Sequence, residues 1–224
     1  GALPGGVGWY RKSFTPTAAD SDKKLYIDFD GAYMNATVYI NGHELGTRPY
    51  GYISFSYDLT PYIEWGKPNV VAVRVDNAEQ PNSRWYSGCG IYRHVWLRKL
   101  DPVHVAQWGT YVTTPHVTAQ EATFSVQTNV ENTTDEAQTI TLQTSLIDAD
   151  GRVVAVAEPA SLTLDAHAIT ATTQSLTLAN PRLWSVDAPY LYRACTELIA
   201  PDGRLLDTYT TTTGARFFRF DAEE

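Results

Sequence analysis

Two short runs of the sequence carry the side chains best suited to hold a ligand. Asp76-Asn77 ends an apolar run, and Arg84-Trp85 follows across a polar loop. A carboxylate accepts hydrogen bonds from hydroxyl groups, a guanidinium presents a planar fork of donors, and an indole offers an apolar face on which a ring can stack. Arg84 and Trp85 are therefore candidates to bind a polar, ring-shaped molecule, and Asp76-Asn77 carries acceptors of the kind that such a ligand needs.

Both runs also have a structural interpretation. Asp-Asn before a loop is common turn chemistry, in which the side chain bonds the backbone two residues further on. Trp85 and Tyr86 can instead pack as a wedge against a neighbouring domain. The sequence leaves these alternatives open, and Arg84 is the stronger functional candidate because its donors suit hydroxyl recognition.

No motif for bond cleavage is visible. Ser87-Gly88-Cys89-Gly90 lacks the Gly-x-Ser-x-Gly spacing of a nucleophile elbow, and the five histidines form no His-Glu-x-x-His metal site. Two distant cysteines, Cys89 and Cys195, provide neither a disulfide framework nor a zinc site. We therefore expect no catalytic residue, no metal site and no cofactor in this chain.

The charge balance argues against nucleic acid as a partner. The 224 residues include 25 acidic and 17 basic side chains, which gives a formal net charge of −8 at pH 7. Binding to a phosphate backbone needs clustered Lys and Arg, and no basic stripe is present. No apolar run approaches the roughly 18 residues that a membrane span requires, and Gly1 to Gly6 lack the features of a signal peptide.

The elements that must position these residues are strands. In residues 24–30 the apolar side chains of Leu25, Ile27 and Phe29 alternate with polar ones, which is typical of a half-buried antiparallel strand. The same period predicts strands at 36–41, 70–75 and 91–97, with a hairpin turn at Asn41-Gly42.

A new series of strands begins after Asp101-Pro102. About seven short runs rich in Thr, Val, Leu and Ile fill the rest of the chain, a spacing typical of an immunoglobulin-like sandwich. We predict strands at 124–130, 140–147, 152–156, 169–178, 191–198 and 205–212. The chain is therefore expected to be all-β, with two domains.

Five segments in order resemble glycoside hydrolase family 2, the family of β-galactosidases, β-glucuronidases and β-mannosidases. The most specific is Arg84-Trp85-Tyr86-Ser87-Gly88-Cys89-Gly90-Ile91-Tyr92-Arg93, whose form is closest to the β-galactosidase branch. The other four are Gly6 to Phe14, Asp30-Gly31-Ala32 with Val38 to Gly42, Val73 to Asn77, and Asn180 to Ser185 with Pro189 to Tyr192.

The resemblance implies a jelly-roll, galactose-binding-like β-sandwich followed by an immunoglobulin-like β-sandwich. It places the first domain at residues 1–101, the second at 102–218, and the start of a link to a catalytic (β/α)8 barrel at 219–224. It also implies that the first domain is incomplete at its N-terminal side, because family members carry further strands before the Gly-Trp-Tyr-Arg segment.

The resemblance further implies a non-catalytic role for this chain. Retaining glycosidases use two carboxyl groups about 5 to 5.5 Å apart, which the family places on its barrel, the acid after an asparagine. No Asn-Glu pair occurs here. Asp76 and Asn77 match the family position near the galactose 6-hydroxyl, and in some members near a sodium ion.

The sequence therefore favours part of a retaining β-galactosidase-like hydrolase that braces its barrel and contributes to the rim of the sugar pocket. Its expected partners are the barrel of the same polypeptide, a β-galactoside and, as an open possibility, further copies of itself. The alternatives are an autonomous carbohydrate-binding module, a purely structural role, and part of a β-glucuronidase or β-mannosidase.

Overall fold

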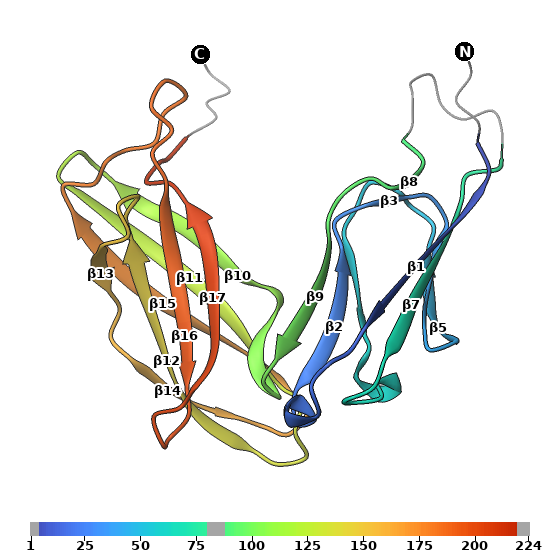
Figure 1. Cartoon of the computed structure of the whole chain (residues 1–224). Coiled ribbons are helices and arrows are strands. Elements are labelled where there is room, and N and C mark those ends of the chain that lie inside the picture. Colours follow the sequence, from blue (N-terminus) through green and yellow to red (C-terminus); the bar gives the residue numbers. More distant parts are fainter. Residues whose placement is uncertain (1–4, 80–87, 219–224) are drawn as a thin grey trace. The chain divides into compact units, whose positions relative to one another are not determined.

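The computed structural model describes residues 5–79 and 88–218. The chain divides into two compact units, with the boundary between Leu100 and Asp101 (Figure 1). In both units antiparallel strands dominate the described residues, as the alternating sequence pattern predicts. The prediction of an all-β fold is confirmed.

Unit 1 contains two facing sheets and one short extra pair. The sheet orders are β1-β7-β4-β5 and β6-β2-β9, and β3 pairs with β8. Two single-turn 3-10 helices, η1 (Ala18–Asp20) and η2 (Thr60–Tyr62), lie in the described connections. The strands are β1 (Val7–Phe14), β2 (Lys24–Phe29), β3 (Ala32–Tyr33), β4 (Ala36–Ile40), β5 (His43–Arg48), β6 (Phe55–Asp58), β7 (Asn69–Asp76), β8 (Gly90–Ile91) and β9 (Val95–Leu100).

The core of unit 1 lies between its two sheets. Every second residue of β7 is buried, since successive side chains of a strand point to opposite faces. Phe29 of β2 stacks on Phe55 of β6, with ring centroids 4.8 Å apart. The buried cluster comprises Leu25, Ile27, Phe29, Ala32, Ala36, Val38, Ile40, Phe55, Leu59, Val71, Val73 and Val75.

The predicted hairpin at Asn41-Gly42 joins β4 to β5. Asn41 has φ of 49° and Gly42 φ of 85°, the pair of positive angles that a type I′ turn requires. The Asn41 amide also donates to Asn69 Oδ1 at 2.7 Å, which ties the turn to the start of β7.

The prediction of one strand at 91–97 is wrong, because the chain changes partner within it. Ile91 of β8 pairs with Ala32, whereas Val95 of β9 pairs with Phe29. The opposing chain turns between Phe29 and Ala32, so residues 92–94 cross from one pairing to the other. The pattern also left β6 unassigned, since this strand has only four residues.

Unit 2 is a second sandwich. One sheet has the order β10-β11-β15; the other has the order β13-β12-β16-β17, and β14 pairs with the same edge of β12 as β13. The strands are β10 (Val103–Val117), β11 (Glu121–Asn132), β12 (Gln138–Ile147), β13 (Val153–Val156), β14 (Ala160–Leu164), β15 (Ile169–Ala179), β16 (Tyr192–Ile199) and β17 (Leu205–Thr213).

Two buried clusters fill unit 2. One centres on Phe124, whose ring meets Tyr192 edge-on at 5.9 Å, and the other surrounds Leu142 and Leu198. Buried Asn132 ends β11, and its amide donates to the carbonyl of Glu136 at 2.8 Å and of Asp165 at 3.0 Å. Among the described residues, no helix is long and apolar enough to cross a membrane.

Candidate functional site

The predicted site residue Asp76 is the last residue of β7, at one end of unit 1. Its backbone amide donates to the carbonyl of Met34 at 3.0 Å, and its own carbonyl accepts from the Asn35 side chain at 3.2 Å. Asn35 also donates its backbone amide to the carbonyl of Pro49 at 3.2 Å. The end of β7, the turn between β3 and β4, and the residue after β5 therefore meet beside Asp76.

Both carboxylate oxygens of Asp76 have protein partners. Oδ1 accepts the Ala78 amide at 3.0 Å, and Oδ2 accepts from the Arg74 guanidinium at 2.6 Å. The Ala78 amide and then the Arg74 side chain hold the pKa of Asp76 below its usual range. The side chain keeps 26% of its surface exposed. Asp76 thus forms the turn expected from its sequence context and still presents a negative charge to solvent.

Asn77 faces into the fold. Only 4% of it is exposed, its backbone amide donates to the carbonyl of Gly6 at 2.9 Å, and its side-chain amide donates to Cys89 Sγ at 2.8 Å. These bonds connect the end of β7 to the residues before β1 and before β8. Asn77 therefore fixes the position of Asp76 at the end of β7.

Glycine is required at two places around the β3–β8 pair. Gly90 has φ of +87°, and a Cβ there would lie 1.9 Å from Tyr10 Oη. A Cβ on Gly31 would lie 2.5 Å from the ring of Tyr92, whose hydroxyl donates to the carbonyl of Gly51 at 2.8 Å. The Gly-Ile-Tyr part of the motif thus shapes this end of the unit.

The predicted residues Arg84 and Trp85, together with Tyr86, lie in 80–87, outside the described residues. The described flanks of that segment are Ala78-Glu79 and Gly88-Cys89. Asp76 and Asn77 are accordingly the predicted site residues for which the structure provides geometry.

An aromatic group that the sequence analysis missed lies near the same end. Tyr33 is buried and approaches Tyr52 with ring centroids 5.1 Å apart, and Tyr52 meets Tyr50 at 5.7 Å. Tyr50 and Tyr52 are exposed. The run Pro49-Tyr50-Gly51-Tyr52 was the available signal, since paired aromatics in a turn offer ring faces for ligand stacking.

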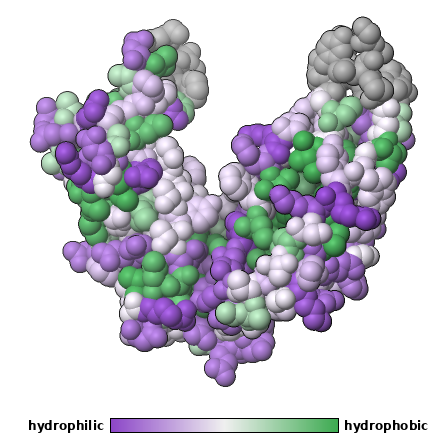
Figure 2. All heavy atoms as spheres, viewed as in Figure 1, coloured by the Kyte–Doolittle hydropathy of each residue, from purple (hydrophilic) through white to green (hydrophobic). Residues whose placement is uncertain are grey.

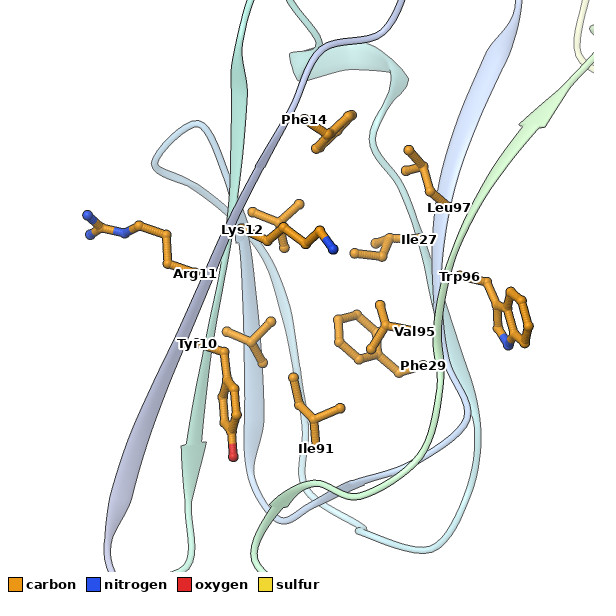
Figure 3. Close-up of a pocket in the computed structure, with 12 residues that line it drawn as sticks. Tyr10, Arg11, Lys12, Phe14, Ile27, Phe29, Ile91, Val95, Trp96 and Leu97 are labelled. Carbon is orange, nitrogen blue, oxygen red and sulfur yellow. The ribbon is translucent and has the colours of Figure 1, made fainter.

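A hollow of unit 1 lies at a different place. A cavity of about 450 Å³ lies between β1 and β9, and its lining contains neither Asp76 nor Asn77. Figure 3 shows Tyr10, Lys12 and Phe14 reaching into it from β1, and Val95 and Leu97 from β9. Because this lining is largely apolar, the cavity does not resemble the hydrogen-bonding site of a sugar.

The described part of the chain offers no cluster of three or more His, Cys, Asp or Glu side chains placed to hold a metal ion. Asp76 contributes one carboxylate, already bonded to a guanidinium and an amide. Within the described residues, Asp76 is therefore suited to recognising a ligand by a charged hydrogen bond.

Comparisons with known families agree with both units. A model described as glycosyl hydrolase 2 galactose-binding domain-like matches residues 8–115. A model described as glycosyl hydrolases family 2 matches residues 103–216. The galactose-binding-like sandwich followed by an immunoglobulin-like sandwich, expected from the sequence, is confirmed.

Comparisons with individual proteins indicate the same family. The chain is 54% identical over all 224 residues to a β-galactosidase of Bacteroides ovatus, of which it spans 26%. It is 39% identical over 98% of its length to a putative β-glucuronidase of Formosa agariphila, spanning 20% of that protein. A solved structure of a glycosyl hydrolase family 2 member from Bacteroides cellulosilyticus superposes with a TM-score of 0.94 at 40% identity, over 98% of this chain and 30% of that one.

The chain thus spans about a quarter of the length of the Bacteroides ovatus β-galactosidase. The family models together extend from residue 8 to residue 216, across both units. This chain belongs to glycoside hydrolase family 2.

Proposed function

We propose that this chain is the non-catalytic N-terminal portion of a retaining β-galactosidase-like hydrolase. In this proposal its two sandwiches brace the catalytic (β/α)8 barrel, and the Asp76 end of unit 1 contributes to the rim of the sugar pocket. The observation that carries it is the 54% identity, over the whole chain, to a β-galactosidase of which the chain spans 26%.

Asp76 is the residue of the described site best suited to contact the sugar. Its partly exposed carboxylate is ionised at neutral pH, as an ordinary aspartate is, and its bonds to Ala78 and Arg74 lower its pKa further. A fixed carboxylate accepts hydroxyl hydrogen bonds, and bonds to charged groups are the stronger ones. We assign Asn77, which is buried, to holding Asp76 in place, and we retain Arg84 and Trp85 as proposed contacts.

The charge of Asp76 favours a galactoside over a glucuronide. The 6-position of galactose carries a hydroxyl, whereas that of glucuronic acid carries a carboxylate. A negative side chain facing this position attracts the first as a donor and repels the second. This argument supports the β-galactosidase alternative within the family.

Exposed apolar side chains of unit 2 support the bracing role. Trp108, Tyr111 and Phe217 are 60%, 67% and 74% exposed, respectively. Trp108 lies in a β-bulge of β10 with φ of 51°; bulges re-aim side chains. Tyr111 and Phe217 line a hollow of about 490 Å³. Large exposed apolar groups mark interaction surfaces, and we propose the barrel as the partner.

The Asp76→Asn variant of the complete hydrolase tests the pocket role. Asparagine keeps an acceptor for the Ala78 amide but removes the charge. We expect kcat/KM for a β-galactoside to fall about tenfold, which corresponds to the ~1.4 kcal/mol of one weakened charged hydrogen bond. Steady-state kinetics with nitrophenyl β-galactoside and β-glucuronide measure both the loss and the change in discrimination.

Asp58→Asn is the matched control. Asp58 ends β6 and accepts the Thr60 amide at 2.8 Å, the same turn chemistry, at the end of unit 1 opposite to Asp76. We expect its kinetics to equal those of the unchanged enzyme. Equal kinetics for Asp76→Asn, measured at a temperature at which the variant is fully folded, would remove Asp76 from the pocket.

Two alternatives make different predictions. The similarity to a putative β-glucuronidase favours a glucuronide-cleaving enzyme, in which Asp76→Asn would raise rather than lower activity on the glucuronide. An autonomous carbohydrate-binding module would bind galactose as the 224-residue chain alone. Isothermal titration of this chain with galactose distinguishes that alternative, because the pocket proposal expects no measurable heat without the barrel.

A further inference from the structure

The turn between β5 and β6 presents two tyrosine rings to solvent. Tyr50 is 57% and Tyr52 45% exposed. Their ring centroids lie 5.7 Å apart, and the angle between the ring planes is 70°. Exposed aromatic side chains that lie together in a loop offer ring faces to which another ring can stack. We call Tyr50 and Tyr52 the tyrosine platform.

Contacts from β3 and from the residue after β8 hold the platform in place. The carbonyl of Gly51, between the two tyrosines, accepts the Tyr92 hydroxyl at 2.8 Å. A Cβ on Gly51 would lie 2.2 Å from the ring of Tyr33 in β3. Tyr52 packs on the same ring, with centroids 5.1 Å apart. Because the turn is already fixed by these contacts, binding a ligand to it costs little ordering entropy.

A single residue connects this turn to Asp76. Asn35 donates its backbone amide to the carbonyl of Pro49 at 3.2 Å and its side-chain amide to the carbonyl of Asp76 at 3.2 Å. Pro49 directly precedes Tyr50. The platform and the carboxylate of Asp76 therefore lie on neighbouring segments at the same end of unit 1.

The chemistry of the platform suits a sugar ring. Figure 2 shows hydrophilic and hydrophobic residues mixed over the visible face of unit 1, so hydropathy alone does not mark a binding surface there. A tyrosine combines an apolar ring with a hydroxyl that donates and accepts hydrogen bonds. A pyranose has the matching arrangement, with C–H groups on its ring faces and hydroxyl groups around its edge.

We propose that the tyrosine platform binds a sugar ring attached to the terminal galactosyl unit of the substrate. This inference rests on the proposed function, in which Asp76 contributes to a pocket for the terminal sugar. A pocket that encloses a terminal sugar leaves at its mouth the group on the anomeric carbon of that sugar. Ring faces beside the rim therefore meet this group. The preferred substrate is then a galactosyl oligosaccharide, in which that group is itself a sugar.

The competing occupant of the platform is protein surface of the catalytic barrel. A protein contact would bury the two rings whatever substrate is bound, and its loss would lower stability. A sugar contact instead distinguishes substrates that carry a second ring from substrates that do not. The two occupants are therefore separated by comparing substrates.

Tyr50→Ala in the complete polypeptide makes this comparison. Lactose carries a second sugar ring on its galactosyl unit, whereas methyl β-galactoside carries a methyl group there. We expect the ratio of kcat/KM for lactose to that for methyl β-galactoside to fall about fivefold, a size typical of one aromatic contact. The change should lie chiefly in the KM for lactose, because the contact is made equally in the bound substrate and in the transition state. Enzymatic detection of released galactose measures both reactions.

Two further variants control the comparison. Tyr50→Phe keeps the ring and should restore most of the native ratio. Tyr62→Ala removes another exposed tyrosine, which is 39% exposed and stacks on His43 with ring centroids 4.7 Å apart. The carbonyl of Tyr62 accepts from Asn41, in the turn between β4 and β5, at the end of unit 1 opposite to Asp76. We expect the native ratio in Tyr62→Ala.

A native ratio in Tyr50→Ala would overturn the platform and leave the proposed function in place. If that ratio is accompanied by lower thermal stability, the rings belong to a contact with the barrel. A polypeptide that cleaves β-glucuronides instead would reject the galactoside assignment alone, and the ratio for a glucuronyl disaccharide and methyl β-glucuronide would then decide the platform. A complete polypeptide that cleaves neither class of glycoside would reject both proposals.

Discussion

Asp76 combines a structural bond with an available charge. Its Oδ1 accepts the Ala78 amide, and its Oδ2 pairs with Arg74. The sequence offered a turn and a pocket contact as alternatives, but the geometry is compatible with both, because each carboxylate oxygen has two lone pairs. The partners of Asp76 hold it in one orientation, as a binding contact requires.

The pKa of Asp76 provides a prediction at this scale. A carboxyl whose pKa is lower in the folded than in the unfolded chain stabilises the fold above the unfolded pKa, about 3.9. That contribution is lost as the pH falls through the folded pKa. The difference in free energy of unfolding between the native chain and Asp76→Asn should therefore be constant between about pH 5 and 7 and shrink below about pH 4. Urea denaturation across this range measures it.

Arg74→Gln is the companion variant. It removes the ion pair but leaves the Ala78 amide, which is the larger cause of the lowered pKa. NMR titration of the Asp76 carboxyl should then give a pKa above that in the native chain and still below the ordinary aspartate value. An unchanged pKa in Arg74→Gln would show that the guanidinium has no influence.

At the scale of elements, the local sequence pattern predicted the regular strands but not the places where one strand ends and the next begins. The alternation in 24–30 and 70–75 corresponds to β2 and β7, and Asn41-Gly42 forms the predicted turn. The single strand predicted at 91–97 is instead β8 and β9, separated where the partner chain turns. Such a break depends on pairing with residues about sixty positions earlier, which no local period contains.

Gly90, at the start of β8, gives a prediction for one junction. Gly90→Ala places a side chain at a positive φ and a Cβ 1.9 Å from Tyr10 Oη. We expect the chain to lose about 2–5 kcal/mol of stability, the sum of left-handed strain and overpacking. Gly42→Ala has nearly the same φ, +85°, but no atom within 4 Å, so it should cost only about 1–2 kcal/mol. Urea denaturation measures both.

The Tyr10→Phe background separates the two causes. Removing the hydroxyl relieves the closest contact, so Gly90→Ala should be less destabilising there than in the native chain. The same relief for Gly42→Ala, or none for Gly90→Ala, would contradict the packing argument.

At the scale of the whole molecule, the chain holds separate cores. The buried cluster around Phe29 contains only residues of unit 1, and the cluster around Phe124 contains only residues of unit 2. Both phenylalanines are fully buried. Because core packing acts through direct contacts, damage to one cluster should be confined to its own unit.

Phe29→Ala and Phe124→Ala test this confinement. Each should cost its own unit about 3–5 kcal/mol. Hydrogen exchange should accelerate in β2, β4 and β7 for Phe29→Ala, and in β11, β15 and β16 for Phe124→Ala. Equal acceleration of both units in either variant would mean that the chain unfolds as a single cooperative body.

The sequence by itself determined the fold class, the turn at Asn41-Gly42, the family and the candidate Asp76, because alternation, turn chemistry and motifs are properties of neighbouring residues. Only the tertiary structure decided that Asn77 is buried beside Cys89, that Tyr10 forbids a side chain at Gly90, and that β1 and β9 leave an apolar hollow between them. The physical reason is that these contacts join residues far apart in the chain. They arise when sheets pair and pack, and a pattern read along the chain carries no information about which distant strands pair with one another.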